Sequence, residues 1–304
     1  MSPAAESIHT IADLAHWSFA GTALAVVGHP IVHSLSPIMQ NAALAELARS
    51  DERFRDWQYF KFDIAPADLP RALTLFYEKG FLGLNLSSPH KVLVLNHLAA
   101  RDSTVLDVGA ANTLRRTDAG WEGFNTDGHG LVCALQAELG AQLPDAAVVL
   151  LGAGGAARGA AVESRRRGCR ELWIGNRTAS NLRTLVADLR RSSPGLALES
   201  FDLASPPADL PADAIVINAS ALGLQPSDPA PIDLRHLSRP TRVFDMIYNP
   251  PSTALLRQAA QLEFPHANGL SMLVHQGARA LELWSNVTAP VELMRRAARA
   301  GLNR

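Results

Sequence analysis

The sequence predicts an α/β fold with two domains, and three observations support this. Its 304 residues exceed the roughly 250–300 at which a single hydrophobic core stops growing. Short apolar runs alternate with segments of helical period, which is typical of βα units and a largely parallel sheet. The composition, 47% hydrophobic and 19% charged, is that of a chain that buries a full core.

The charge balance excludes several kinds of partner. The formal net charge is -1, from 28 Lys+Arg against 29 Asp+Glu, so no general attraction to nucleic acid or to an anionic membrane is expected. The basic run 165–167 lies at the end of a predicted helix and is interpreted as a solvated face.

Cysteine and histidine usage indicates no disulfide framework and no metal site. Cys133 and Cys169 stand alone in apolar settings, as expected of reduced thiols, and the ten histidines show no metal-ligand spacing. Residues 1–20 lack the pattern of a secretory leader, and no run of about 18 apolar residues follows. We therefore expect a cytoplasmic location.

The elements form two series. In the first, strands are predicted at 22–28, 57–62 and 82–86, helices at 37–48, at 66–77 and from about 89, and a strand pair at 112–116 and 121–124. In the second, helices are predicted at 128–139, after 155 and at 178–191, strands at 146–151, 171–174, 214–218 and 242–246, and two final helices at 271–284 and 289–300.

A glycine turn near the middle of the chain predicts a dinucleotide site. An apolar strand runs directly into Gly152-Ala153-Gly154-Gly155-Ala156-Ala157 and then into a helix. Gly152 allows a tight turn, Gly154 lets the backbone approach a pyrophosphate, and Ala157 permits close packing of helix on strand. The helix N-terminus offers free N–H groups to phosphate.

The end of the next strand favours NADP over NAD. An NAD enzyme usually presents Asp or Glu to the ribose hydroxyl about 20 residues after the glycine turn, but here Asn176-Arg177-Thr178 follows the strand. A guanidinium can pair with a 2′-phosphate in a fork geometry, whereas an exposed loop cation is the alternative explanation of Arg177.

Polar turns in the first half mark a candidate chemical site. Ser34 and Ser36 follow the strand 22–28, and Ser36 before Pro37 has the form of a helix N-cap. Ser34 has no such explanation, and hydroxyls at the end of a strand can bind a polyhydroxy or carboxylate substrate.

A lysine and an aspartate lie at the ends of two other elements. Ser87 and Lys91 stand at the turn into a Pro-opened helix, Asn112 precedes a strand, and Asp127 lies just ahead of a helix that it could cap. In one cleft, Lys91 and Asp127 would form a pair able to handle the proton that accompanies hydride transfer at an alcohol or ketone.

Taken together, these stretches resemble the shikimate dehydrogenase family. The resemblance rests on ordered motifs at residues 33–37, 85–91, 109–114, 125–127, 152–158, 176–178, 218–220, 245–248 and 268–278. It implies a substrate-binding catalytic domain of residues 1–126, completed by 269–304, and an NADP-binding Rossmann domain of residues 127–268. The C-terminal helices would return to the first domain.

The resemblance also implies roles for single residues. Lys91 and Asp127 would be the catalytic pair. The side chains that would bind shikimate or 3-dehydroshikimate are those of Ser34, Ser36, Ser87, Asn112, Tyr248 and Gln276. The residues that would bind NADP(H) are the glycine turn at 152–157, Asn176, Arg177, Thr178, Met246 and Gly269.

Four positions depart from the family's pattern. Gln40 stands in place of a histidine, Ser87 in place of threonine, Ala111 in place of a larger β-branched residue, and Asn181 in place of a second basic residue. Ser87 keeps a hydroxyl, whereas Asn181 removes one possible phosphate contact.

The expected function is the reversible, NADP-linked interconversion of 3-dehydroshikimate and shikimate by a monomer or homodimer. Two alternatives stay open. One is an NAD-dependent quinate or quinate/shikimate dehydrogenase, against which Arg177 and the serine turn argue. The other is a non-catalytic shikimate-sensing binding protein.

Overall fold

The computed structural model describes residues 7–237 and 241–302, and its described residues form two compact units. The first unit holds the chain up to Asp127 and again from Val274 onward, and the second holds Gly128–Leu273. Residues 1–6, part of the segment examined for a leader, lie outside the described residues, as do residues 303 and 304 of the C-terminal segment. Each unit contains one sheet with helices packed on it, which confirms the α/β class.

The first unit is built on a seven-stranded sheet in the order β1-β3-β2-β4-β6-β7-β5. Its strands are β1 (Ile8–His9), β2 (Thr22–Gly28), β3 (Trp57–Asp63), β4 (Gly83–Leu86), β5 (Ala100–Arg101), β6 (Thr113–Thr117) and β7 (Gly120–Phe124). Strands β1 to β4 pair in parallel, whereas β6 pairs antiparallel with both β4 and β7. Because β3 and β4 lie on opposite sides of β2, the carboxyl ends of β2 and β4 form a topological switch point, where ligands bind in open α/β sheets.

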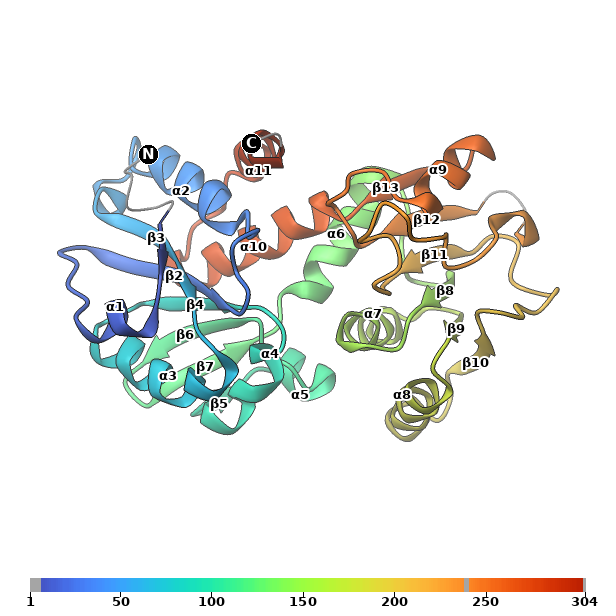
Figure 1. The fold of residues 1–304 in the computed structure, drawn as a ribbon, viewed down its shortest axis with the longest axis horizontal. Helices are drawn as coiled ribbons and strands as arrows, with labels where there is room; N and C mark the ends of the chain where they lie inside the picture. The colour runs from blue at the N-terminus through green and yellow to red at the C-terminus, as the bar shows by residue number, and fades with distance from the viewer. Residues whose placement is uncertain (1–6, 238–240, 303–304) are drawn as a thin grey trace. The chain divides into compact units, whose positions relative to one another are not determined.

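Helices cover both faces of this sheet (Figure 1). They are α1 (Ile11–Ala15), α2 (Ser36–Leu47), α3 (Leu69–Glu78), α4 (His90–Leu93) and α5 (Ser103–Val108), with short 3-10 turns η2 (Glu52–Phe54), η3 (Pro66–Asp68) and η4 (Val94–His97). On one face, apolar side chains of α1 and α3 pack with those of β2, β3 and β4 into a single core. On the other, α2 packs against β2 and β3.

The last helices belong to the first unit, as the sequence analysis expects. Helix α10 (Leu270–Ser285) enters it at Val274, and α11 (Val291–Leu302) packs along α2, where Figure 1 shows the dark red α11 beside the blue α2. The indole of Trp284 anchors α10, because it is buried and donates a hydrogen bond of 2.8 Å to the carbonyl of Leu114 in β6. Only glycine fits beneath it, since a Cβ at Gly83 would lie 2.1 Å from the indole nitrogen.

The second unit is a six-stranded parallel sheet in the order β10-β9-β8-β11-β12-β13. Its strands are β8 (Ala147–Leu151), β9 (Glu171–Asn176), β10 (Ala197–Asp202), β11 (Ile215–Asn218), β12 (Arg242–Asp245) and β13 (His266–Asn268). Its helices are α6 (Asp127–Leu139, from Gly128 onward), α7 (Gly155–Arg166), α8 (Ala179–Ser192) and α9 (Ala254–Gln261), with the turn η5 (Leu234–His236). Counted within this unit, the strand order is that of the doubly wound dinucleotide-binding fold, with its switch point between β8 and β11.

Strand β10 and helix α9 of the second unit are among the elements that the sequence patterns do not predict. Strand β10 has only Leu198 and Phe201 buried, because it is an edge strand whose remaining side chains face solvent. Helix α9 has two turns, too short for its apolar period to stand out, and it begins at a cap in which Thr253 accepts a hydrogen bond from the N–H of Leu256. Both elements form because the neighbouring strands supply a surface for them.

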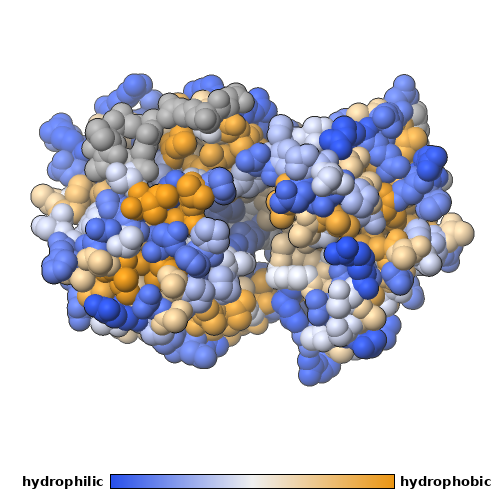
Figure 2. All heavy atoms as spheres, viewed as in Figure 1, coloured by the Kyte–Doolittle hydropathy of each residue, from blue (hydrophilic) through white to orange (hydrophobic). Residues whose placement is uncertain are grey.

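The surface mixes hydrophilic and hydrophobic residues. Figure 2 shows the two kinds interspersed over the face that is drawn. Large hydrophobic side chains that are exposed among the described residues are those of Ile8, Val32, Val92, Leu93, Leu106 and Leu224. None of the helices formed by the described residues has the length and apolar character needed to traverse a bilayer.

We expect Gly83→Ala to destabilise the first unit by about 2–4 kcal/mol, because the new methyl group displaces Trp284 and leaves its N–H without an acceptor. Chemical denaturation followed by tryptophan fluorescence measures the loss. Gly159→Ala is the control, since a Cβ at Gly159 in α7 meets open space and alanine favours a helix by about 1 kcal/mol. Equal stability of the Gly83 variant and the parent protein would contradict the packing described.

Candidate functional site

The turn that carries Ser87, after β4, contacts the carboxyl end of β2. A Cβ at Gly28, the last residue of β2, would lie 2.0 Å from the hydroxyl oxygen of Ser87, which follows β4. The missing side chain therefore makes room for the Ser87 hydroxyl. The backbone N–H of Ser87 also donates to the carbonyl of Val27, at 3.0 Å, which fixes the turn.

The sequence interpretation of the first serine turn is wrong in one respect. Helix α2 begins at Ser36, its N-cap is Leu35, and no side chain caps it. The hydroxyl with a local structural role is that of Ser34, which accepts a hydrogen bond of 3.4 Å from the N–H of Ser36. Ser36 instead is buried, and its side chain partly offsets the rise that burial causes in the pKa of Tyr59 in β3.

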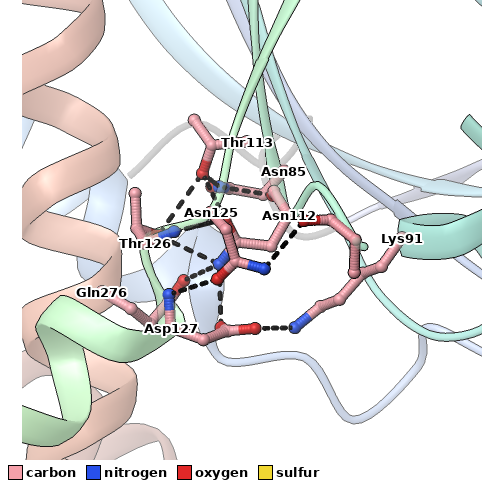
Figure 3. A network of polar contacts seen from close by, with 9 residues as sticks. Asn85, Lys91, Asn112, Thr113, Asn125, Thr126, Asp127 and Gln276 are labelled. Atoms are coloured by element: carbon pink, nitrogen blue, oxygen red, sulfur yellow. Dashed lines mark hydrogen bonds and ion pairs between the residues drawn. The ribbon is translucent and has the colours of Figure 1, made fainter. Parts of the chain in front are cut away.

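Lys91 and Asp127 form an ion pair, with 2.6 Å between the ammonium nitrogen and a carboxylate oxygen (Figure 3). Their side chains are 25% and 26% exposed, so the pair is shielded from bulk water and still reachable by a small molecule. Lys91 lies in α4, and its backbone carbonyl accepts from the N–H of Ala111 at 2.8 Å, which ties this turn to the segment that carries Asn112.

Asp127 is the first residue of α6, and its carboxylate faces the site. One oxygen accepts from Lys91, and the other accepts a hydrogen bond of 2.8 Å from the side-chain amide of Asn112. Its own backbone N–H donates to the side-chain oxygen of Asn125, at 3.1 Å. The capping explanation of Asp127 therefore does not account for its side chain.

The amide of Asn112 is the centre of a buried network, drawn in Figure 3. Its oxygen accepts from the backbone N–H of Thr126 at 2.9 Å, which forces its nitrogen to face Asp127. The same nitrogen lies 3.4 Å from the side-chain oxygen of Gln276 in α10. The structure therefore brings Lys91, Asn112, Asp127 and Gln276 together.

Several members of the network were not identified from the sequence. Asn85 and Thr113 are register partners on β4 and β6, and the Asn85 amide donates to the Thr113 hydroxyl at 3.0 Å. Both are buried. An asparagine inside an otherwise apolar strand was the available signal, because a buried amide needs partners of its own.

The glycine turn of the second unit has the form that a pyrophosphate needs. Gly152 has a φ of +122°, and a Cβ there would lie 2.9 Å from the carbonyl oxygen of Ala219. At Gly154 and Gly155 a Cβ would meet open space, so the backbone at the start of α7 is accessible. Ala157 is fully buried where α7 packs on β8. These residues fit a bound dinucleotide phosphate.

The segment after β9 places the Arg177 cation at the carboxyl end of the strand that pairs with β8. Arg177 and Thr178 are exposed, and the side-chain amide of Asn176 donates to the carbonyl of Thr178 at 2.9 Å. Among the described residues Arg177 forms no hydrogen bond, and its charge contributes to lowering the pKa of Asp228, after two backbone hydrogen bonds to that carboxylate. Its guanidinium donors are available for an anion.

Met246 and Gly269, from the ends of β12 and β13, lie against each other. A Cβ at Gly269 would lie 2.0 Å from the carbonyl oxygen of Met246, so only glycine fits there. Tyr248 follows Met246 in the second unit, and burial raises the pKa of its phenol. The backbones of Met246 and Gly269 are thus in direct contact.

A buried carboxylate organises the same strand ends. Asp245 accepts hydrogen bonds from the side chains of Asn218 (3.0 Å) and Thr253 (2.7 Å) and from the N–H of Ile247 (3.0 Å). Burial raises its pKa, and these three hydrogen bonds oppose the increase. The loops after β11 and β12 are therefore held by one ionisable group.

Within the part of the chain that the structure describes, no group of three His, Cys, Asp or Glu side chains could hold a metal ion. The two units together offer a dinucleotide-binding sheet and a lysine–aspartate pair at a separate sheet edge, a combination that defines a class of nicotinamide-dependent oxidoreductases.

Comparison with known proteins identifies the family. Residues 26–114 match the shikimate dehydrogenase substrate binding domain, and residues 269–299 match the shikimate 5'-dehydrogenase C-terminal domain. The shikimate dehydrogenase (NADP(+)) of Symbiobacterium thermophilum is 38% identical over 286 residues, covering 93% of this chain and 95% of that protein. This chain belongs to the shikimate dehydrogenase family, so the resemblance seen in the sequence is confirmed.

Solved structures of similar proteins agree with this family assignment. Shikimate 5-dehydrogenase from Thermus thermophilus, in complex with NADP(H) and shikimate, has a TM-score of 0.80 and 32% identity and covers 92% of this chain and 99% of its own. Quinate dehydrogenase from Corynebacterium glutamicum, in complex with NAD, has a TM-score of 0.81 and 26% identity, with coverage of 92% and 99%. The fold therefore accommodates either coenzyme.

We expect Thr253→Val to lower the free energy of unfolding by about 2–4 kcal/mol at neutral pH, because it removes a helix cap and a donor to a carboxylate. Thr253→Ser, which keeps the hydroxyl, is the control. The loss should shrink toward pH 4. Because the pKa of Asp245 is raised in the folded state, its carboxyl adds most to the free energy of unfolding below its unfolded-state pKa, where it is protonated. A protonated carboxyl loses less than a carboxylate does when the Thr253 donor is removed. Denaturation curves at several pH values test this, and a loss independent of pH would contradict the assigned contact.

Proposed function

We propose that this chain is an NADP-dependent shikimate dehydrogenase, which reversibly reduces 3-dehydroshikimate to shikimate in aromatic amino acid biosynthesis. The observation that carries the proposal is the ion pair of Lys91 and Asp127, joined to Asn112 and Gln276 in a member of this family. The first unit binds the substrate and the second binds the coenzyme.

The residues of the first unit divide the chemistry between them. A dinucleotide held by the second unit would supply the hydride that the carbonyl carbon C3 receives. The ammonium of Lys91 donates a hydrogen bond to the carbonyl oxygen and stabilises the negative charge that develops there. A proton from this ammonium makes the oxygen a hydroxyl, and the amine regains a proton from solvent, directly or through Asp127. Asp127 holds Lys91 in place at 2.6 Å and accepts from a substrate hydroxyl or shares in the proton transfer.

Other polar groups orient the substrate. The hydroxyls of Ser34, Ser36 and Ser87 at the carboxyl ends of β2 and β4 are assigned to the carboxylate and the ring hydroxyls, together with Asn112, Gln276 and Tyr248. In the second unit, the turn 152–157 and Asn176, Arg177, Thr178, Met246 and Gly269 are assigned to NADP(H). We also expect a cytoplasmic monomer or homodimer.

Lys91→Ala should lower kcat for shikimate oxidation by about 10²–10⁴-fold, because it removes the donor to the reacting oxygen. The affinity for NADP+ should stay near normal, because Lys91 belongs to the first unit. Steady-state kinetics followed by NADPH absorbance measure both quantities. Lys79→Ala, which removes an exposed lysine at the end of α3, is the control.

Full turnover by the Lys91 variant would refute its role. Turnover of quinate with NAD+ in preference to shikimate with NADP+ would instead favour the quinate dehydrogenase alternative. Binding of shikimate without turnover by the parent protein would favour a sensing protein.

Arg177→Ala should raise the KM for NADP+ by about 10–100-fold and leave that for NAD+ nearly unchanged, because a hydrogen bond between charged groups contributes about 1.5–3 kcal/mol. The control is Arg183→Ala, an exposed arginine on α8. An equal change with both coenzymes would show that Arg177 does not recognise the 2′-phosphate.

A further inference from the structure

A buried chain of hydrogen bonds reaches from β3 to the Lys91 and Asp127 pair. The phenol of Tyr59, fully buried in β3, donates to the side-chain oxygen of Asn85 in β4 at 2.8 Å. The Asn85 nitrogen donates to the Thr113 hydroxyl, which in turn donates to the side-chain oxygen of Asn112 at 3.0 Å. Asn112 then donates to Asp127.

The directions of the links from Tyr59 through Asn85 to Thr113 are fixed. The Asn85 nitrogen also faces the carbonyl of Asn112, at 3.2 Å, so the amide cannot be reversed and its oxygen must face Tyr59. The single proton of the Tyr59 phenol is then committed to Asn85.

The orientation of the Asn112 amide is fixed by its partners in the same way. Its oxygen accepts from the Thr126 N–H and from the Thr113 hydroxyl. Its nitrogen donates to Asp127 at 2.8 Å and to the Thr126 hydroxyl at 3.0 Å, with Gln276 at 3.4 Å. Asn85, Asn112, Thr113 and Thr126 are all buried, so none of these groups can turn to water at low cost. These buried groups connect Tyr59 to the Asp127 carboxylate by hydrogen bonds.

We propose that Tyr59, acting through Asn85 and Thr113, is a positioning residue that sets the orientation of the Asn112 amide and thereby of the Asp127 carboxylate and Lys91. This inference rests on the proposed function for its kinetic consequence. The coupling of Tyr59 to Asn112 is inferred from the hydrogen bonds alone and does not depend on that function. Burial raises the pKa of the Tyr59 phenol well above its usual range, which favours the protonated phenol that donates to Asn85.

The experiment compares two tyrosine-to-phenylalanine variants. Tyr59→Phe leaves the ring in place and removes the donor to Asn85. Tyr77→Phe is the matched control, because the Tyr77 hydroxyl in the same unit donates to the carbonyl of Thr117 at 2.7 Å, outside the network. Both variants lose one shielded hydrogen bond, so a purely structural effect lowers the melting temperature of both.

We expect Tyr59→Phe to lower kcat for shikimate oxidation by about 10–100-fold, since a small misplacement of catalytic groups has an effect of this size. The pH profile of kcat should shift as well, while the KM for NADP+ stays unchanged and Tyr77→Phe keeps parental kinetics. Thr113→Val, which breaks the chain at a different link with a side chain of the same shape, should reproduce the effect and replaces Tyr59→Phe if that variant does not fold.

A second measurement does not depend on turnover. The side-chain amide signals of Asn112 in nitrogen-15 NMR should shift in Tyr59→Phe and stay in place in Tyr77→Phe. Unchanged Asn112 signals, or parental kinetics in both Tyr59→Phe and Thr113→Val, would overturn the proposal. If the parent protein does not oxidise shikimate, the proposed function fails and the NMR comparison still decides whether Tyr59 positions Asn112.

Discussion

The hydrogen bond between the Asn112 amide and the Asp127 carboxylate is the contact on which the first unit's site depends. It joins the loop before β6 to the first residue of α6, and Asp127 in turn holds Lys91 from α4. Three segments that are distant in sequence are thus fixed by one amide, whose own orientation is dictated by a backbone N–H and a threonine hydroxyl. The cost of leaving any of these buried groups unpaired keeps the arrangement in one state.

The two sheets present their functional residues for the same geometric reason. In each, the strand order reverses beside the first long parallel strand, β2 in the first unit and β8 in the second. The chain therefore leaves neighbouring strands in opposite directions, and their carboxyl ends border an open crevice. Ser87 with Gly28, and Gly152 with Ala219, are the close approaches at these two points.

Gly28 and Gly152 make these two close approaches possible because they have no side chain. Buried polar groups form the hydrogen bonds that hold the loops nearby. Asn112 serves the first unit and Asp245 the second. Apolar contacts fix distance but not direction, whereas hydrogen bonds fix both. A lysine, a carboxylate and an amide must be held at set angles in this site. The asparagines and threonines that surround it form the hydrogen bonds that hold them.

The sequence by itself determined the α/β class, most strand positions, the glycine turn and the identity of Lys91 and Asp127 as the pair to examine, because periodicity and turn chemistry are local properties. It did not show that Ser34, and not Ser36, stabilises its turn, nor that Asn85, Thr113 and Tyr59 stand behind Asn112. Those relations depend on which residues the register of β4 with β6 and the pairing of β2 with β3 bring together. Only the tertiary structure decides this, since a hydrogen bond between strands requires a distance and a direction that no spacing along the chain encodes.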